Sequence, residues 1–180
     1  MDLIERGRLG PTFGDRVMKV NHAGENGAVH IYTGQIMLAR LTARSLVTEL
    51  REFRIHEQRH RAIFATELAR RGARRCRSYW LCGFGGLVLG LATGLLGPRA
   101  IGATTAAVER VVLAHLREQL AALSGSDVEA AAAISRIVDE EQQHLDQSAS
   151  RLSQTGFWPR LLSPVVAAAT EVVIWLGMRL

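Results

Sequence analysis

The chain is poor in the residues that cross-link or interrupt a fold: it has two cysteines, four prolines and 6% aromatic residues among 180. Cys76 and Cys82 stand six residues apart and form no C-x-x-C pair. A disulfide framework is therefore not expected, and a reducing compartment is the default. The first apolar run does not begin near the terminus, so the sequence predicts no secretory signal.

Lysine is almost absent as well. Lys19 is the only one, so arginine supplies nearly all the positive charge behind the net charge of +5. The sequence has no zinc-finger spacing, no aromatic RNA-binding signature and no basic helix followed by heptads. These absences exclude the common nucleic-acid-binding modules, and we expect no nucleic-acid partner. Anionic lipid and codon bias remain as explanations of the arginines.

What the chain does contain is helix-forming sequence. Its 48% hydrophobic content leans on Ala, Leu and Val, which with so few prolines favours an all-α fold. The length suits a single domain spanning residues 1–180. Apolar residues at helical spacing predict helices over residues 12–40, 45–71, 100–123, 127–152 and, after two prolines, 165–180.

Four glutamates and two histidines recur with a fixed spacing. They are Glu25, Glu57 and His60 in the first half of the chain, and Glu109, Glu141 and His144 in the second. In each half the second glutamate follows the first by 32 residues and begins a Glu-x-x-His motif. The offset between the halves is 84 residues for all three pairs, so the chain contains a hidden two-fold repeat.

This spacing places each set at one height in a helical hairpin, because residues at equal height lie equally far from the turn. The turn that brings Glu109 opposite Glu141 and His144 falls near residue 126, in the sequence SGSD. The corresponding turn of the first half falls near residue 42. Residues three apart lie on one helix face. Two packed hairpins can therefore point four carboxylates and two imidazoles at one place.

Such a donor set is that of a carboxylate-bridged di-iron or di-manganese centre in a four-helix bundle. Four carboxylates offset most of the charge of two metal ions, and two nitrogens leave open positions for O₂. A single Glu-x-x-His motif is more often a solvated polar face. Two of them at this spacing favour the metal site, since burying these groups unpaired would cost several kcal/mol.

A resemblance to a known family rests on five segments: NHAGENGAVHIYTGQ, HEQRH, AAVERVVLAHLREQL, DEEQQH and AAATEVVIWLGMRL. They resemble the demethoxyubiquinone hydroxylases (the Coq7 family) of ubiquinone biosynthesis over roughly residues 14–180, and NHAGE is the most specific mark. The resemblance implies a ferritin-like, membrane-associated di-iron monooxygenase that uses O₂ to hydroxylate the ring of a polyprenylated methoxy-methyl-benzoquinone or quinol. It implies the same six ligands for two iron ions, with Glu57 and Glu141 as the bridging carboxylates.

Two positions beside the motifs are candidates for supporting the metal ligands. The family often has a His-Tyr pair after the third ligand, but here His115 is followed by Leu116, so that tyrosine is missing. His115 is a candidate for orienting a ligand or exchanging protons, and Asp139 for orienting a ligand histidine, since metal-bound histidines commonly have a carboxylate partner. An ordinary core or surface role is the alternative for both.

The segment 78–97 contains twenty uncharged residues and follows five arginines, Arg70, Arg71, Arg74, Arg75 and Arg77. Its length reaches that of a spanning helix, but a crossing would put the two halves of the shared site on opposite sides of the bilayer. Its glycines at 86, 90 and 94 suit close helix packing. We predict that 78–97 and 165–180 are apolar helices at the membrane surface, with the arginines at anionic headgroups. A buried connecting helix is the alternative.

The expected location is thus peripheral, on the cytoplasmic face of the cell membrane, or on the matrix face of the mitochondrial inner membrane in a eukaryote. No Rossmann glycine motif for NADH or flavin is present. Electrons are expected from a partner protein, from the quinol itself, or from NADH bound in another way. Other proteins of a ubiquinone-biosynthesis complex and a second copy of the chain are further expected partners.

Two alternative functions remain. One is a different di-iron enzyme, a quinol oxidase or a peroxide-reducing ferritin-like protein. The other is a non-catalytic iron-binding scaffold in a biosynthetic complex. The NHAGE segment favours the quinone hydroxylase over the first alternative, and a measurement of metal content and turnover separates either enzyme from the scaffold.

Overall fold

Helices make up the regular structure of the residues that the computed structural model describes, 12–152 and 156–179. No strand occurs in these ranges, which confirms the all-α prediction. The elements in chain order are α2 (Phe13–Thr42), the 3-10 turn η1 (Arg44–Leu46), α3 (Val47–Arg70), α4 (Tyr79–Leu96), α5 (Pro98–Leu123), α6 (Val128–Ser135), α7 (Val138–Ser150) and α8 (Phe157–Gly177).

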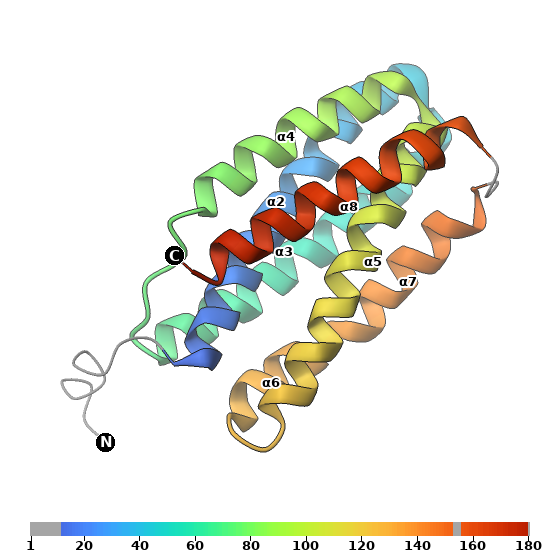
Figure 1. Cartoon of the computed structure of the whole chain (residues 1–180). Helices are drawn as coiled ribbons and strands as arrows, with labels where there is room; N and C mark the ends of the chain where they lie inside the picture. Colours follow the sequence, from blue (N-terminus) through green and yellow to red (C-terminus); the bar gives the residue numbers. More distant parts are fainter. Residues whose placement is uncertain (1–11, 153–155, 180) are drawn as a thin grey trace.

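Two helical hairpins carry the repeated acids and histidines. In the first, α2 packs against α3, and in the second, α5 packs against α7 (Figure 1). α2 ends at its C-cap, Ala43, and residues 124–127 separate α5 from α6. Both turns therefore lie where equal height of the acids and histidines requires them, near residues 42 and 126.

The segment 127–152 is not the single helix that the sequence predicts. It contains two helices, α6 and α7, because the backbone turns tightly at Arg136 and Ile137, where the Ile137 N–H donates to the Ile134 carbonyl at 3.1 Å. Both isoleucines are wholly buried in the core cluster. After this turn, α7 starts with acidic residues in its first turn, where they complement the helix dipole.

The last helix also starts earlier than predicted. α8 begins at Phe157, includes Pro159 in its first turn and continues through Pro164. A first-turn proline is tolerated because its missing N–H would have no helical partner, whereas Pro164 removes one interior hydrogen bond. The predicted end of this helix at Leu180 lies outside the described residues.

α4 lies against α2 along a line of glycines, as the spacing of Gly86, Gly90 and Gly94 predicts. A Cβ atom on Gly86 would lie 2.3 Å from the carbonyl oxygen of Gly27, and one on Gly90 would lie 2.1 Å from that of Ile31. The two backbones are thus in direct contact. The opposite face of α4 exposes large apolar side chains, so the segment is not the fully buried connecting helix that was the alternative.

A buried arginine ties the ends of three helices together. Arg71 donates to Asp127 through both terminal nitrogens, at 2.7 and 2.6 Å, and its Nε donates to Glu67 at 2.7 Å. Asp15 accepts a weaker bond at 3.3 Å. Asp127 is also the N-cap of α6. The hydrogen bond from Arg71 lowers the pKa of Asp127 below its usual value.

We expect Arg71→Leu to lower the free energy of unfolding by about 2 kcal/mol at pH 7, because partly buried carboxylates lose their partner. The depressed pKa of Asp127 fixes the sign of the pH dependence: the stabilisation is present above the ordinary value of 3.8 and is lost as the pH falls through the folded-state value. Urea unfolding from pH 7 to pH 3 should therefore show the two proteins converging in acid. Arg70→Leu is the control, since the Arg70 side chain is 48% exposed and its pairs are worth little. An equal loss at every pH would contradict the assignment.

Candidate metal centre and its pocket

The structure brings the six repeated side chains together in the middle of the bundle. Each is exposed by 4% or less. Glu25 comes from α2, Glu57 and His60 from α3, Glu109 from α5, and Glu141 and His144 from α7. Four helices therefore contribute, as the spacing predicts.

The donor atoms form two overlapping groups, within each of which all atoms lie within 4.8 Å of one another. We call the group Glu25, Glu57, His60 and Glu141 position A, and the group Glu57, Glu109, Glu141 and His144 position B. Glu57 and Glu141 belong to both. The arrangement can therefore place one ion at each position with two carboxylates between them, which is the pattern of a carboxylate-bridged pair.

The unpaired atoms of this cluster fit metal ions. His60 Nδ1 lies 2.8 Å from Glu141 Oε1, and His144 Nδ1 lies 3.1 Å from Glu57 Oε1. Neither contact has hydrogen-bond geometry, and all four atoms are buried without a hydrogen-bond partner. Buried polar atoms normally have such a partner. Donor atoms that crowd together without bonding to one another are what the ligands of a shared ion require, and carboxylate with imidazole suits iron or manganese.

The charges lead to the same conclusion. Burial, and then the neighbouring carboxylates, raise the pKa of Glu25 and of Glu109 well above the usual value. Burial works against a charged His60, but the adjacent carboxylates of Glu141 and Glu57 raise the pKa of this histidine to about 12. The metal-free centre thus retains protons at neutral pH. Metal ions would replace them as the counter-charge, so metal affinity should fall as the pH falls.

Each cluster histidine turns its second ring nitrogen away from the centre. His60 Nε2 lies 2.8 Å from Glu140 Oε2, and His144 Nε2 lies 3.0 Å from His56 Nδ1. Burial lowers the pKa of His56, which favours its neutral form. Burial opposes ionisation of Glu140, but its hydrogen bond with His60 and the neighbouring charges lower its pKa.

Neither of the two residues predicted to support the metal ligands, Asp139 and His115, contacts the six clustered side chains. Asp139 is exposed and makes no contact with the cluster, whereas Glu140, one residue later, bonds to His60. His115 contacts none of the six residues; its Nε2 lies 2.8 Å from Glu171 Oε2 of α8. A signal for Glu140 was present in the sequence. It directly precedes a Glu-x-x-His glutamate, and His56 holds the equivalent place in the first half.

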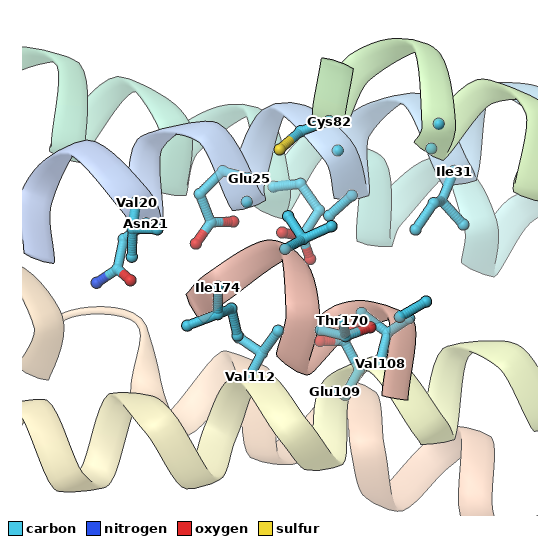
Figure 2. A pocket seen from close by; sticks show the side chains of 18 of the residues that line it. Val20, Asn21, Glu25, Ile31, Cys82, Val108, Glu109, Val112, Thr170 and Ile174 are labelled. Carbon is cyan, nitrogen blue, oxygen red and sulfur yellow. The ribbon is translucent and has the colours of Figure 1, made fainter. Parts of the chain in front are cut away.

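An apolar pocket of about 480 Å³ opens onto the cluster. Its walls come from α2, α4, α5 and α8, and the carboxylate residues of both positions line its inner end. Figure 2 shows Glu25 on α2 and Glu109 on α5 on opposite sides of the pocket, with Thr170 and Ile174 of α8 beside them. Polar groups on the wall are few, and they include Asn21, Cys82 and His115. The cluster can therefore act on an apolar molecule that enters from the α4 and α8 side.

The outer faces of α4 and α8 expose a set of large apolar side chains. We call this the apolar face; it comprises Trp80, Leu81, Phe84, Val88, Leu95, Phe157, Leu161, Val165, Val172 and Trp175. Both helices are long and apolar enough to cross a bilayer by length and composition. α4 and α8 lie on the same side of the bundle in Figure 1 and both line the pocket, so the apolar face borders its entrance.

Known proteins are similar to this chain over most of its length. A family model described as "Ubiquinone biosynthesis protein COQ7" matches residues 12–177. A 3-demethoxyubiquinol 3-hydroxylase of Rhodospirillum rubrum is 35% identical over 167 residues, which are 92% of this chain and 77% of that protein. Mitochondrial NADPH-dependent 3-demethoxyubiquinone 3-hydroxylases of Dictyostelium discoideum and Homo sapiens are each 29% identical, over 98% and 92% of this chain and 82% and 77% of their own lengths.

Proposed function

Because the chain belongs to the COQ7 family of ubiquinone-biosynthesis proteins, we propose that it is a hydroxylase of a demethoxyubiquinol or demethoxyubiquinone ring. The ring would lie in the pocket against the carboxylates, and the polyprenyl tail would leave between α4 and α8. The two hairpins would act as one domain, since each supplies half of the centre.

The observation that carries this proposal is the meeting of an apolar pocket with a buried acidic cluster. Glu25, Glu57, Glu109 and Glu141 reach the pocket, while most of its wall is apolar. A storage or scaffold protein has no need of an apolar chamber at its metal site. A quinone ring is mostly apolar with a few polar substituents, which is the character of the pocket.

We propose that two iron ions occupy positions A and B, held by the six residues of the cluster. When bound, they would supply the activation of O₂ that ring hydroxylation needs. The chain itself holds the ligands in place through the hydrogen bonds of His56 with His144, of Glu140 with His60 and of Tyr32 with Glu109. Its apolar wall excludes water from the reacting ring. His115, oriented by Glu171, stands on the wall where its ring can exchange a proton with a quinol hydroxyl.

Two relatives are named NADPH-dependent hydroxylases, and these names indicate a candidate source of electrons for this chain. We propose a reduced nicotinamide nucleotide, NADH or NADPH, as the donor. Turnover with each nucleotide, compared with turnover of a chemically reduced quinol alone, distinguishes direct use of the nucleotide from electrons delivered by the substrate.

We propose that the apolar face rests on a membrane, since a polyprenyl quinone is confined to the bilayer. The relatives from Dictyostelium discoideum and Homo sapiens are mitochondrial, and peripheral attachment on the matrix or cytoplasmic side would suit this chain. Of the five arginines expected at headgroups, Arg70 and Arg71 are used in pairs with Glu67. Arg74, Arg75 and Arg77 are exposed and remain the candidates for anionic lipid.

We expect Val88→Glu to weaken binding to vesicles of phosphatidylcholine with anionic lipid by at least about 10-fold, because it places a charge within the apolar face. Val88 is half exposed and does not line the pocket. Iron content and turnover of a short-tailed quinol should stay unchanged, while turnover of a long-tailed quinol in vesicles should fall.

Val128→Glu is the matched control, since Val128 is 69% exposed at the start of α6, away from the apolar face. Vesicle flotation of the two variants gives the comparison. If both float like the natural protein, the apolar face does not bind the membrane.

The hydroxylation itself is tested by extracting quinones from cells that lack this protein. We expect a demethoxyquinone to accumulate, and the normal quinone to return when the gene is restored. Unchanged quinones would contradict the proposal. Purified protein that consumes O₂ or peroxide without hydroxylating the ring would favour a different di-iron enzyme, and protein that binds iron without any turnover would favour the scaffold.

A further inference from the structure

The two-fold repeat makes positions A and B alike in their own donors. Each has one terminal glutamate, one histidine and the two shared carboxylates. Even the close contacts are related by the repeat, since His60 approaches Glu141 and His144 approaches Glu57. Any difference between the two positions must therefore come from the residues that touch these donors from outside.

The first such difference is in the residues that contact the outer ring nitrogens of His60 and His144. His56 and Glu140 are equivalent in the repeat, because they are separated by the same 84 residues. The outer ring nitrogen of the position A histidine, His60, faces a carboxylate, whereas that of the position B histidine, His144, faces the imidazole of His56. A carboxylate partner raises the basicity of a metal-bound imidazole more than a neutral partner does.

The second difference lies at the terminal glutamates. Tyr32 donates its hydroxyl to Glu109 Oε1 of position B at 2.6 Å. The repeat equivalent of Tyr32 is Leu116, again 84 residues on, and leucine has no hydrogen to donate. Among the described residues, no donor from outside the cluster reaches Glu25. The tyrosine bond withdraws charge from the position B carboxylate, while the position A carboxylate keeps its charge.

Both differences act in one direction. We infer that the two metal positions are unequal: position A, backed by Glu140, binds its ion more tightly and fills first, and position B, backed by His56 and Tyr32, is the weaker site that fills second. His56 and Glu140 are then positioning residues that set the order of loading. The inference rests on the proposed metal centre and goes beyond it, because a symmetric pair would serve the same donors.

The experiment is an anaerobic titration of the metal-free full chain with Fe²⁺ against a competing chelator, which resolves the two dissociation constants. Outer partners of metal ligands change affinity by about 10- to 100-fold. Glu140→Gln replaces the charged acceptor behind His60 with a neutral one. It should weaken the first step by about 10-fold and the second by much less, since Glu140 Oε2 lies 3.9 Å from His56 Nδ1, so the two constants converge.

His56→Leu removes the acceptor behind His144. It should weaken the second step by about 10-fold and leave the first unchanged, so the constants diverge. His56→Gln, which keeps a neutral acceptor, should restore the natural second step, a rescue that a packing role alone would not give. Glu52→Gln, on the exposed surface of α3, is the matched control for charge. Mössbauer spectra with one ⁵⁷Fe per chain should show one iron environment, and spectra with two should show a second.

Two equal steps in the natural protein, or Glu140→Gln acting mainly on the second step, would overturn the inference while leaving the metal centre in place. The failure of the proposed function is a separate outcome, because the natural protein would then bind no Fe²⁺ at this cluster or would bind it without hydroxylating a quinol.

Discussion

Changing Glu57 and Glu141 together to alanine should reduce the bound iron from about two ions per chain to almost none and abolish hydroxylation. These two residues alone belong to both donor groups, so their loss removes two donors from each position. Buried carboxylates without metal are costly to ionise, and removing two of them lessens the repulsion in the empty centre. The variant should therefore remain helical while losing its metal, as measured by circular dichroism and metal analysis of the same sample.

The matched control is Glu52→Ala with Glu129→Ala, which removes two glutamates from the exposed surfaces of α3 and α6. Both side chains are exposed and neither lines the pocket, so iron content and turnover should stay at the natural level. If the Glu57 and Glu141 double variant still binds two irons and hydroxylates its substrate, the centre lies elsewhere.

Gly90→Ala should lower the free energy of unfolding by about 3 kcal/mol, a large effect for a single methyl group. The new Cβ would lie 2.1 Å from the carbonyl oxygen of Ile31 and 2.8 Å from its carbonyl carbon. These are backbone atoms inside a long helix, so no side chain can rotate away, and α4 must move off α2. Because Cys82 and Leu89 of α4 form part of the pocket wall, the same movement should also weaken binding of a quinol.

Gly85→Ala is the control in the same helix, since a Cβ at Gly85 meets no atom within 4 Å. It should leave the protein as stable or more stable, by up to about 1 kcal/mol, because alanine is the better helix former. Urea unfolding of both variants gives the comparison. Equal effects would show that the α2–α4 contact is looser than the backbone positions indicate.

The convergence of the six acids and histidines was predictable because two simple rules determine it. The helical period puts Glu57 and His60 on one face, and the position of the turn sets the height of Glu25 opposite them. The glycine contact between α4 and α2 was predictable for a similar reason. A spacing of four along the helix leaves one face without side chains.

The remaining features depend on packing that no single segment of sequence determines. Glu140 rather than Asp139 meets His60 because α7 restarts at Val138, after the tight turn at Ile137. Arg71 is buried because it pairs with Asp127, which lies far along the chain. Its place in a run of arginines therefore did not indicate that it joins helices inside the protein. The passage of α8 through Pro164 likewise goes against local propensity and is tolerated on a helix that packs against α5.

The most direct test of the central claim is to supply iron-loaded protein with a demethoxyquinol and ¹⁸O₂ and to measure the mass of the product by mass spectrometry. If the buried cluster activates O₂ against a ring held in the pocket, the new hydroxyl carries ¹⁸O, and the label disappears in the Glu57 and Glu141 double variant. A product whose new oxygen comes from water, or the same labelled product from metal-free protein, would contradict the account.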